Sequence, residues 1–279
     1  TRFGQIQICN KSLFSRHPCG FGISPYLQEK LLYLAQEGTY QEATQSLKHL
    51  LGLEVSPVQI YRLAHHYGQA IEASLNDKVT AEKEPDLQQE NVYAMVDGAM
   101  ILTDEGYKEN KLGRIFNNKS LKSSAVENRG GYIESSLYVT HLGTGIDFIS
   151  KIKVHLDPYK TLGKNLVFNS DGAPWIRQMI EENYPQATMI LDFYHVMEYI
   201  AAIAVASFGK GSNADRWLEN QRMLLLDSQI DSVLCNLKSL KVDANLRKIT
   251  SNYLASNRDR MDYKTYRERK LIIGSGAIE

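Results

Sequence analysis

Three aspartates could do chemistry together because each stands in or directly after an apolar run. Asp97 lies inside the run 91–100, and Asp171 and Asp192 follow the runs 166–170 and 187–191. Runs of this length with β-branched and aromatic residues are typical of buried strands. Ligand sites in open α/β sheets form outside the carboxyl ends of strands. The spacing therefore indicates three carboxylates at one edge of a sheet.

Carboxylates gathered at one edge repel one another unless a positive charge lies between them. Hard oxygen ligands suit Mg²⁺ or Mn²⁺, and two such ions ~3.5–4 Å apart serve phosphoryl transfer. The alternative is structural: Asp97 closes a turn with Gly98, and the other two cap the helices that follow them. Asp192 leads straight into F-Y-H-V-M-E, so capping is a serious rival there. The residues alone leave both interpretations open.

The elements that would position these aspartates follow an α/β order. We expect three strands in a meander, then helix, strand, helix, strand and helix, which gives a mixed sheet with helices packed on it. The strands are expected at 91–103, 108–117, 132–141, 166–170 and 187–191. The helices are expected at 143–155 (stopped before Pro158), 175–184, 192–206 and throughout 212–257.

Three helices are expected near the N-terminus. Ser24-Pro25 opens the first, and capping boxes at Thr39–Glu42 and Ser56–Gln59 open the second and third. Gly52 ends the second. Their apolar positions predict these inward-facing residues: Leu27, Leu31, Leu34, Ala35, Ala43, Leu47, Leu50, Leu51, Ile60, Leu63, Ala64, Tyr67 and Ile71.

The short turn between the second and third helices is typical of a helix-turn-helix at about 39–71. The third helix would be the recognition helix, with Gln59, Arg62, His66 and Gln69 off its apolar stripe. A plain helical hairpin with a solvated face fits the same spacing.

The polar segment 73–90 predicts a linker between a helical region, 1–72, and the α/β domain, 91–279. Phe3, Ile6 and Ile8 suggest a short strand, and Cys9, His17 and Cys19 resemble a zinc knuckle without a C-x-x-C pair.

Composition excludes little beyond a membrane protein and a strongly basic nucleic-acid coat. The 32 basic and 32 acidic residues cancel, although a local basic face can hide inside a neutral total. No apolar run approaches the ~18 residues of a membrane span, and no secretory leader is visible. Three scattered cysteines suit a reducing compartment. Because the chain begins at Thr1 and stops after G-S-G-A-I-E, we expect a fragment of a longer protein.

Five segments together resemble bacterial insertion-sequence transposases of the DDE class, in the Mutator-like group, and the order of elements resembles the RNase H-like fold. The segments are V-D-G-A-M-I (96–101), K-E-N-K-L-G-R-I-F (108–116), N-S-D-G-A-P-W-I (169–176), I-L-D-F-Y-H-V (190–196) and I-G-S-G-A-I-E (273–279).

This resemblance implies an RNase H-like catalytic domain with a helical insertion at about 205–257, preceded by a small helix-turn-helix domain. It matches Asp97, Asp171 and Glu279 to the catalytic, metal-binding triad. It gives Asp192 and His195 an auxiliary role in shaping the site or contacting DNA.

The implied cofactor is a pair of Mg²⁺ or Mn²⁺ ions, and the implied partner is double-stranded DNA, both transposon terminal repeats and target. A homo-oligomer in the bacterial cytoplasm, associated with the nucleoid, is also implied. Phosphate contacts are expected from Lys111, Arg114, Lys119 and Lys122, each with a solvated edge strand as the alternative. Trp175 would stack on a base or pack under its helix. A DNA-binding protein without catalysis and a nuclease without strand transfer are the competing functions.

Overall fold

The computed structural model describes residues 23–78, 91–122 and 131–274, without the side chains of 75–78. They divide between two compact units, 1–83 and 84–279. The segment predicted as a linker at 73–90 begins as helix, because α4 continues to Lys78. The predicted features of the first 20 residues lie outside the described part of the chain; these are Phe3, Ile6, Ile8, Cys9, His17 and Cys19.

The described part of the first unit contains three helices, as the capping signals predict. Ser24 accepts a hydrogen bond from the Leu27 N–H, and Thr39 and Glu42 form a reciprocal capping box. Gly52 ends the second helix with a left-handed φ of 65°, which glycine adopts without steric cost. The helices are α2 (Pro25–Glu37), α3 (Tyr40–Leu51) and α4 (Pro57–Lys78).

The core of this unit contains most of the residues that the sequence predicts to face inward. Its buried apolar residues are Leu31, Ala43, Leu47, Ile60 and Leu63, and the predicted residues Leu27, Leu34, Ala35 and Tyr67 are partly buried against them.

Three residues that the sequence places inside are instead exposed. Leu50 and Leu51 are 68% and 52% exposed in the last turn of α3, directly before Gly52. Ile71 is 58% exposed. It lies in the C-terminal half of α4, which has 22 residues against 13 in α2 and 12 in α3, so α4 is too long for these helices to cover.

The second unit is built on a five-stranded mixed sheet of order β5-β2-β1-β6-β7. β1, β6 and β7 run parallel, β2 is antiparallel to β1, and β5 is antiparallel to β2. The predicted α/β class is therefore confirmed. The strands are β1 (Asn91–Thr103), β2 (Gly106–Asn117), β5 (Leu137–Leu142), β6 (Asn165–Ser170) and β7 (Thr188–Leu191). Two short strands, β3 (Leu121–Lys122) and β4 (Tyr132–Ile133), pair separately.

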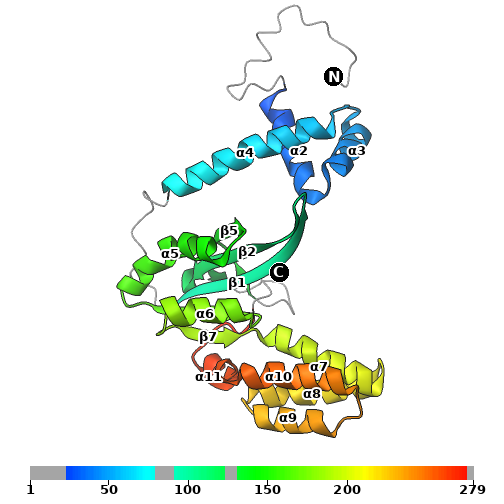
Figure 1. Ribbon diagram of the computed structural model, residues 1–279, viewed down its shortest axis with the longest axis vertical. Coiled ribbons are helices and arrows are strands. Elements are labelled where there is room, and N and C mark those ends of the chain that lie inside the picture. The colour runs from blue at the N-terminus through cyan, green and yellow to red at the C-terminus, as the bar shows by residue number, and fades with distance from the viewer. Residues whose placement is uncertain (1–22, 79–90, 123–130, 275–279) are drawn as a thin grey trace, which may run out of the picture. The chain divides into compact units, whose positions relative to one another are not determined.

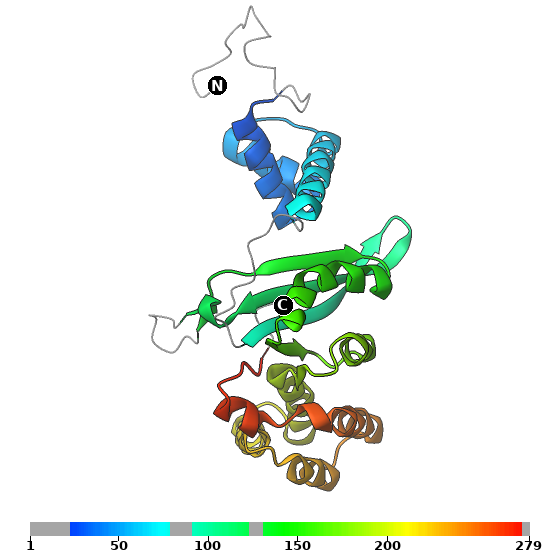
Figure 2. The ribbon, with the colours of Figure 1, turned by 90° about the vertical axis from the view of Figure 1, so that its left-hand side faces the viewer.

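Helices cover both faces of the sheet. α5 and α6 pack on one face, and α7 to α11 gather into a bundle whose core includes the other face (Figures 1 and 2). Gly113 of β2 lets α5 approach closely, because a Cβ there would lie 2.8 Å from Ile152 Cδ1. The helices are α5 (Gly145–Thr161), α6 (Pro174–Asn183), α7 (Phe193–Phe208), α8 (Ser212–Leu226), α9 (Ile230–Ser239), α10 (Ala244–Ser256) and α11 (Tyr263–Glu268), with short 3₁₀ turns at η1 (Asn118–Ser120) and η2 (Arg258–Arg260).

Two predicted boundaries in this unit are wrong. The strand expected at 132–141 is interrupted, because Ser135 bonds Ser120 at 3.0 Å and Ser136 accepts a bond from Arg114 at 2.8 Å. α5 does not stop before Pro158 but continues to Thr161. The proline is tolerated there because only the last helical turn follows it, and Val154, whose carbonyl loses a donor, is exposed.

β1 is longer than its pairing with β6. β6 pairs only with residues 91–95, whereas β2 pairs with residues 92–103. Beyond Asp97 the two strands continue as a ribbon (Figure 1), on which Met100, Leu102 and Tyr107 are exposed. The prediction that the run 91–100 is buried throughout is therefore wrong for 98–100.

Within the described residues, no helix has both the length and the apolar character to span a membrane.

Candidate active site: a row of three aspartates

Asp97, Asp171 and Asp192 occupy one row across three neighbouring parallel strands. β1 and β6 are paired up to Met95 and Asn169, so Asp97 and Asp171 follow at matching positions two residues later. β6 and β7 are paired up to Ser170 and Leu191, so Asp171 and Asp192 follow immediately. Neighbouring strands lie ~4.8 Å apart. The register therefore places the three aspartates in one row at the carboxyl ends of β6 and β7 and beside the middle of β1.

By strand alternation, the side chains of Asp97 and Asp171 also belong to the same face of the sheet. Alternate residues of a strand point to one face, and Asp97 continues the row of Tyr93 and Met95, while Asp171 continues that of Val167 and Asn169. Tyr93, Met95 and Val167 lie in the core that the sheet shares with α7 to α11. The row thus opens on the side of the helical bundle.

Asp97 lies inside β1, at the point where this strand loses its partner β6. The turn interpretation requires Asp97 to end a strand, but β1 continues to Thr103. The Oδ1 of Asp97 accepts the Gly98 N–H at 2.7 Å. Burial raises the pKa of the Asp97 carboxyl, and the nearby charges of Asp171 and Asp192 raise it further. The Gly98 hydrogen bond and His195 act in the opposite direction on this pKa.

Asp171 sits in a tight turn between β6 and α6. Its Oδ1 accepts the Ala173 N–H at 2.9 Å, and its backbone carbonyl accepts the Tyr253 hydroxyl at 2.6 Å. Gly172 has a φ of 94°, and a Cβ there would lie 2.7 Å from Leu191 Cδ1. The D-G pair is therefore required both by the backbone conformation and by the close packing of the turn.

Asp192 is fully buried and is the N-cap of α7. Its Oδ1 accepts the N–H groups of Tyr194 at 2.7 Å and His195 at 3.3 Å. The capping alternative is confirmed for this residue. A carboxylate at a helix N-terminus is also stabilised by the helix dipole. Capping fixes the start of α7, and with it His195, beside the row.

His195 is held by groups of α7 and α10. Its Nδ1 lies 3.3 Å from Glu198 Oε2, and its ring meets those of Tyr199 and Tyr253 edge-on, with centroids 5.4 and 6.0 Å away. Its charge lowers the pKa of the Asp97 carboxyl. The imidazole is thus oriented by its neighbours and remains partly exposed.

The donor set at this row suits a hard divalent cation. Asp97 and Asp171 each engage Oδ1 with a backbone N–H. Oδ2 of each has no hydrogen-bond partner among the described residues. Two neighbouring carboxylates, one with a raised pKa, gain stability when a cation lies between them. Within the described ranges, however, no three His, Cys, Asp or Glu side chains form a group that could hold a metal ion.

Glu279, the third residue of the expected triad, lies outside the described residues. The segment that leads toward it docks beside the row: the Ile273 carbonyl accepts the Phe193 N–H at 2.9 Å, and the Ile272 carbonyl accepts the Asn169 amide at 3.4 Å. Gly274 is packed so closely that a Cβ would lie 2.4 Å from the Tyr194 ring. The chain is therefore anchored at the site five residues before Glu279.

Two expected phosphate contacts are buried in the second unit. Lys111 is 5% exposed; its Nζ donates to Glu109 at 2.8 Å and to the Gly143 carbonyl at 2.9 Å. Arg114 is 9% exposed and donates to Ser136. The expectation that they face a DNA backbone is corrected, because both cations tie β2 to neighbouring loops.

Three further residues of this unit are expected to contact DNA; two lie at the surface and one packs against the core. Lys119 and Lys122 are exposed, and Lys122 lies 3.5 Å from Glu134. Trp175 packs edge-on against Phe148 with ring centroids 5.9 Å apart, which supports the packing interpretation. Of these described residues, the two lysines lie at the surface, whereas Trp175 belongs to the packing of α6.

On α4, the residues expected to read DNA lie away from the core. Arg62, His66 and Gln69 are exposed, and Gln69 bonds His65 at 3.0 Å. Gln59 is half-buried, and its N–H donates to Ser56 at 3.3 Å. This polar face is compatible with a recognition helix and equally with a solvated helical hairpin.

Sequence reasoning missed the tyrosine that meets the row from the helical bundle. Tyr253 lies 82 positions from Asp171, to which it is bonded, and no local pattern marks that contact. It stacks on Tyr199 with centroids 4.3 Å apart.

We compared the chain with known protein families and with curated proteins. No family model matches this chain, and no curated protein matches it significantly.

Proposed function

We propose that this protein is a DDE-type DNA transposase with an RNase H-like catalytic domain. Its five long strands, counted along the chain, have the spatial order three-two-one-four-five, and the first three form an antiparallel meander. The helix α5 separates the third of these strands from the fourth, and α6 separates the fourth from the fifth. This order supports the resemblance drawn from the five sequence segments.

The observation that carries the proposal is the row formed by Asp97, Asp171 and Asp192. Asp97 and Asp171 would hold Mg²⁺ or Mn²⁺, with Glu279 as the third ligand. When bound, a pair of such ions supplies the charge that activates an attacking oxygen and stabilises a leaving one. A phosphodiester of the transposon end would be hydrolysed first, and the freed 3′-hydroxyl would then attack target DNA.

The protein's own contribution is to position these groups. The sheet fixes Asp97 and Asp171 at matching heights, and their N–H bonds orient each carboxylate. Asp192 holds the first turn of α7, which carries His195. His195 would act as an auxiliary residue, since its charge favours the ionised form of Asp97.

DNA binding by the first unit is the second part of the proposal. α3 and α4 would act as a helix-turn-helix, with Gln59, Arg62, His66 and Gln69 meeting the duplex. Arg62 is the one arginine or lysine between positions 57 and 74. Phosphate attraction through the predicted recognition segment of α4 therefore depends on this residue.

The catalytic proposal is tested by incubating the protein with Mg²⁺ or Mn²⁺ and a DNA fragment carrying the sequences that flank its gene. Strand cleavage and joined products are then resolved on denaturing gels. Removing even an outer-shell partner of a metal ligand costs about 10–100-fold. Asp97→Asn and Asp171→Asn should therefore lower cleavage by more than about 100-fold. Asp227→Asn, at an exposed turn after α8, is the matched control.

The outcomes separate the competing functions. Cleavage without joined products would indicate an RNase H-like nuclease. DNA binding without any cleavage would indicate a binding protein that has kept the fold. Undiminished cleavage by Asp97→Asn would remove the catalytic assignment altogether.

The binding proposal is tested by measuring affinity for the same DNA over a range of salt concentrations. Arg62→Ala should weaken binding and reduce the slope of log K against log salt by about 1. Lys30→Ala removes an exposed cation of α2 that is paired with Glu29 and should leave the slope unchanged. Equal slopes for Arg62→Ala and wild type would indicate that α4 does not face the phosphates.

A further inference from the structure

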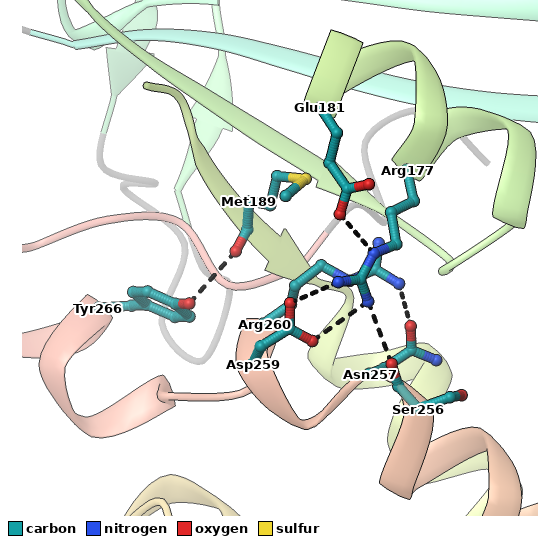
Figure 3. Close-up of polar contacts among 8 residues, drawn as sticks. All are labelled: Arg177, Glu181, Met189, Ser256, Asn257, Asp259, Arg260 and Tyr266. Atoms are coloured by element: carbon teal, nitrogen blue, oxygen red, sulfur yellow. Dashed lines mark hydrogen bonds and ion pairs between the residues drawn. The ribbon is translucent and has the colours of Figure 1, made fainter. Parts of the chain in front are cut away.

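Three tyrosines from the helical region donate their hydroxyls to the backbone of the row and of β7. Tyr253 of α10 bonds the Asp171 carbonyl at 2.6 Å, and Tyr263 and Tyr266 of α11 bond the Leu191 and Met189 carbonyls at 3.0 and 3.2 Å. Figure 3 shows the last of these bonds. Of these three tyrosines, only Tyr253 donates to a residue of the aspartate row.

The ring of Tyr253 is fixed from several sides. It stacks on Tyr199 at an interplanar angle of 14°, and its edge lies close enough to Gly172 that a Cβ there would be 3.3 Å from Tyr253 Cε2. Burial raises the pKa of the Tyr253 hydroxyl well above its ordinary value. The hydroxyl therefore remains a proton donor throughout the neutral range.

A second tie joins the end of the same helix to the helix that follows Asp171. Arg177 of α6 makes two bonds to the Asp259 carboxylate, at 3.2 and 2.8 Å, and one to the Ser256 carbonyl at 3.1 Å (Figure 3). Tyr253 thus attaches the turn containing Asp171 to α10. Arg177, in the first turns of α6, attaches that helix to the end of α10 and to η2.

The orientation of the Asp171 carboxylate depends on this turn. Its Oδ1 accepts the N–H of Ala173, so the carboxylate moves with the backbone of 171–173. A bond to the Asp171 carbonyl therefore controls where Oδ2 lies relative to Asp97.

We infer that Tyr253 is a positioning residue for Asp171, through which the helical bundle sets the affinity of the aspartate row for a divalent cation. This inference rests on the proposed function, because it concerns the same row. It goes further by giving the helical insertion a specific task. A merely structural Tyr253 would contribute to stability and leave cation affinity unchanged.

The test compares Tyr253→Phe with Tyr266→Phe, since each variant removes one hydroxyl that bonds a strand carbonyl. Mn²⁺ binding to DNA-free protein is measured by electron paramagnetic resonance of the free ion, and the thermal midpoint is measured in parallel. Loss of an outer-shell partner should weaken Mn²⁺ binding by about 10-fold or more in Tyr253→Phe. Tyr266→Phe should bind Mn²⁺ as wild type does, with a comparable fall in thermal midpoint.

Wild-type affinity in Tyr253→Phe would overturn the inference and leave the proposed function intact. Absence of Mn²⁺ binding in the wild-type protein, with no cleavage, would overturn both. Asp259→Asn weakens the second tie at an exposed position and should weaken Mn²⁺ binding in the same direction. If Tyr253→Phe does not fold, this variant decides, and unchanged affinity in it overturns the inference.

Discussion

Asp97 and Asp171 lie side by side on parallel strands, each two residues beyond the paired residues Met95 and Asn169. Asp192 extends the same row on the next strand. Such a row of like charges is unfavourable for folding unless a cation neutralises it. Under the proposed function, the row trades stability for cation binding, as active sites commonly do.

Replacing Asp97 by Asn should stabilise the metal-free protein at neutral pH. Folding raises the pKa of the Asp97 carboxyl. The folded wild-type protein therefore loses stability as the pH rises through this raised pKa. The Asn variant carries no ionisable group at this position and does not lose this stability. After allowance for solvent screening, the free energy of unfolding should rise by about 0.5–1 kcal/mol. Urea denaturation in the presence of a chelator measures it.

Mn²⁺ provides the internal control for this prediction. It should stabilise the wild-type protein, because the cation binds the folded row, and should stabilise Asp97→Asn much less. A variant that is less stable than wild type without metal would show that the Gly98 hydrogen bond outweighs the repulsion.

The sequence predicts the sheet and the aspartate row well, because both depend on local patterns. Each apolar run has the length of a strand, and Asp171 and Asp192 follow their strands directly. The helical region is predicted for the same reason, since the amphipathic pattern of 212–257 covers α8, α9 and α10.

The features that the sequence does not reveal depend on distant partners. Lys111 and Arg114 are cations within a segment that the sequence allows to be an exposed edge strand. They are buried because β2 is an inner strand, with the Gly143 carbonyl and Ser136 close by. Tyr253 reaches Asp171 across 82 positions. Such contacts arise only when segments far apart in the sequence pack together.

Gly172→Ala should destabilise the protein more than Gly106→Ala, because the two positions share backbone strain but differ in packing. Their φ angles are 94° and 97°, so alanine costs about 1–2 kcal/mol at each. A Cβ at Gly172 would also lie 2.7 Å from Leu191, whereas nothing lies within 4 Å of one at Gly106. Overpacking adds about 1–3 kcal/mol. Equal unfolding free energies for the two variants would indicate that Leu191 moves aside freely.

The Arg177–Asp259 pair should contribute a measurable coupling between α6 and η2. Arg177 is 31% exposed and makes two bonds to the carboxylate, a geometry that strengthens an ion pair. A double-mutant cycle with Arg177→Ala and Asp259→Ala should give about 0.5–1 kcal/mol, decreasing with salt. The more exposed Arg222–Glu219 pair within α8 should give less. A coupling no larger than that of this pair would mean that Arg177 ties the helices through Ser256 alone.

Asp262 should stabilise the protein at neutral pH and lose this effect in acid. It caps α11: its carboxylate accepts the Ser228 hydroxyl at 2.7 Å and the Thr265 N–H at 3.4 Å, and these bonds lower its pKa. A lowered folded-state pKa gives stability that is present above the unfolded value, ~3.9, and is lost as the pH falls through the folded value. Asp262→Ala should therefore cost about 1 kcal/mol at neutral pH and progressively less below about pH 4, as measured by urea denaturation over a pH series. Ser228→Ala removes the main cause of the shift and should move the loss to higher pH. A cost of Asp262→Ala that stays constant in acid would show that the cap acts through its shape and not through its charge.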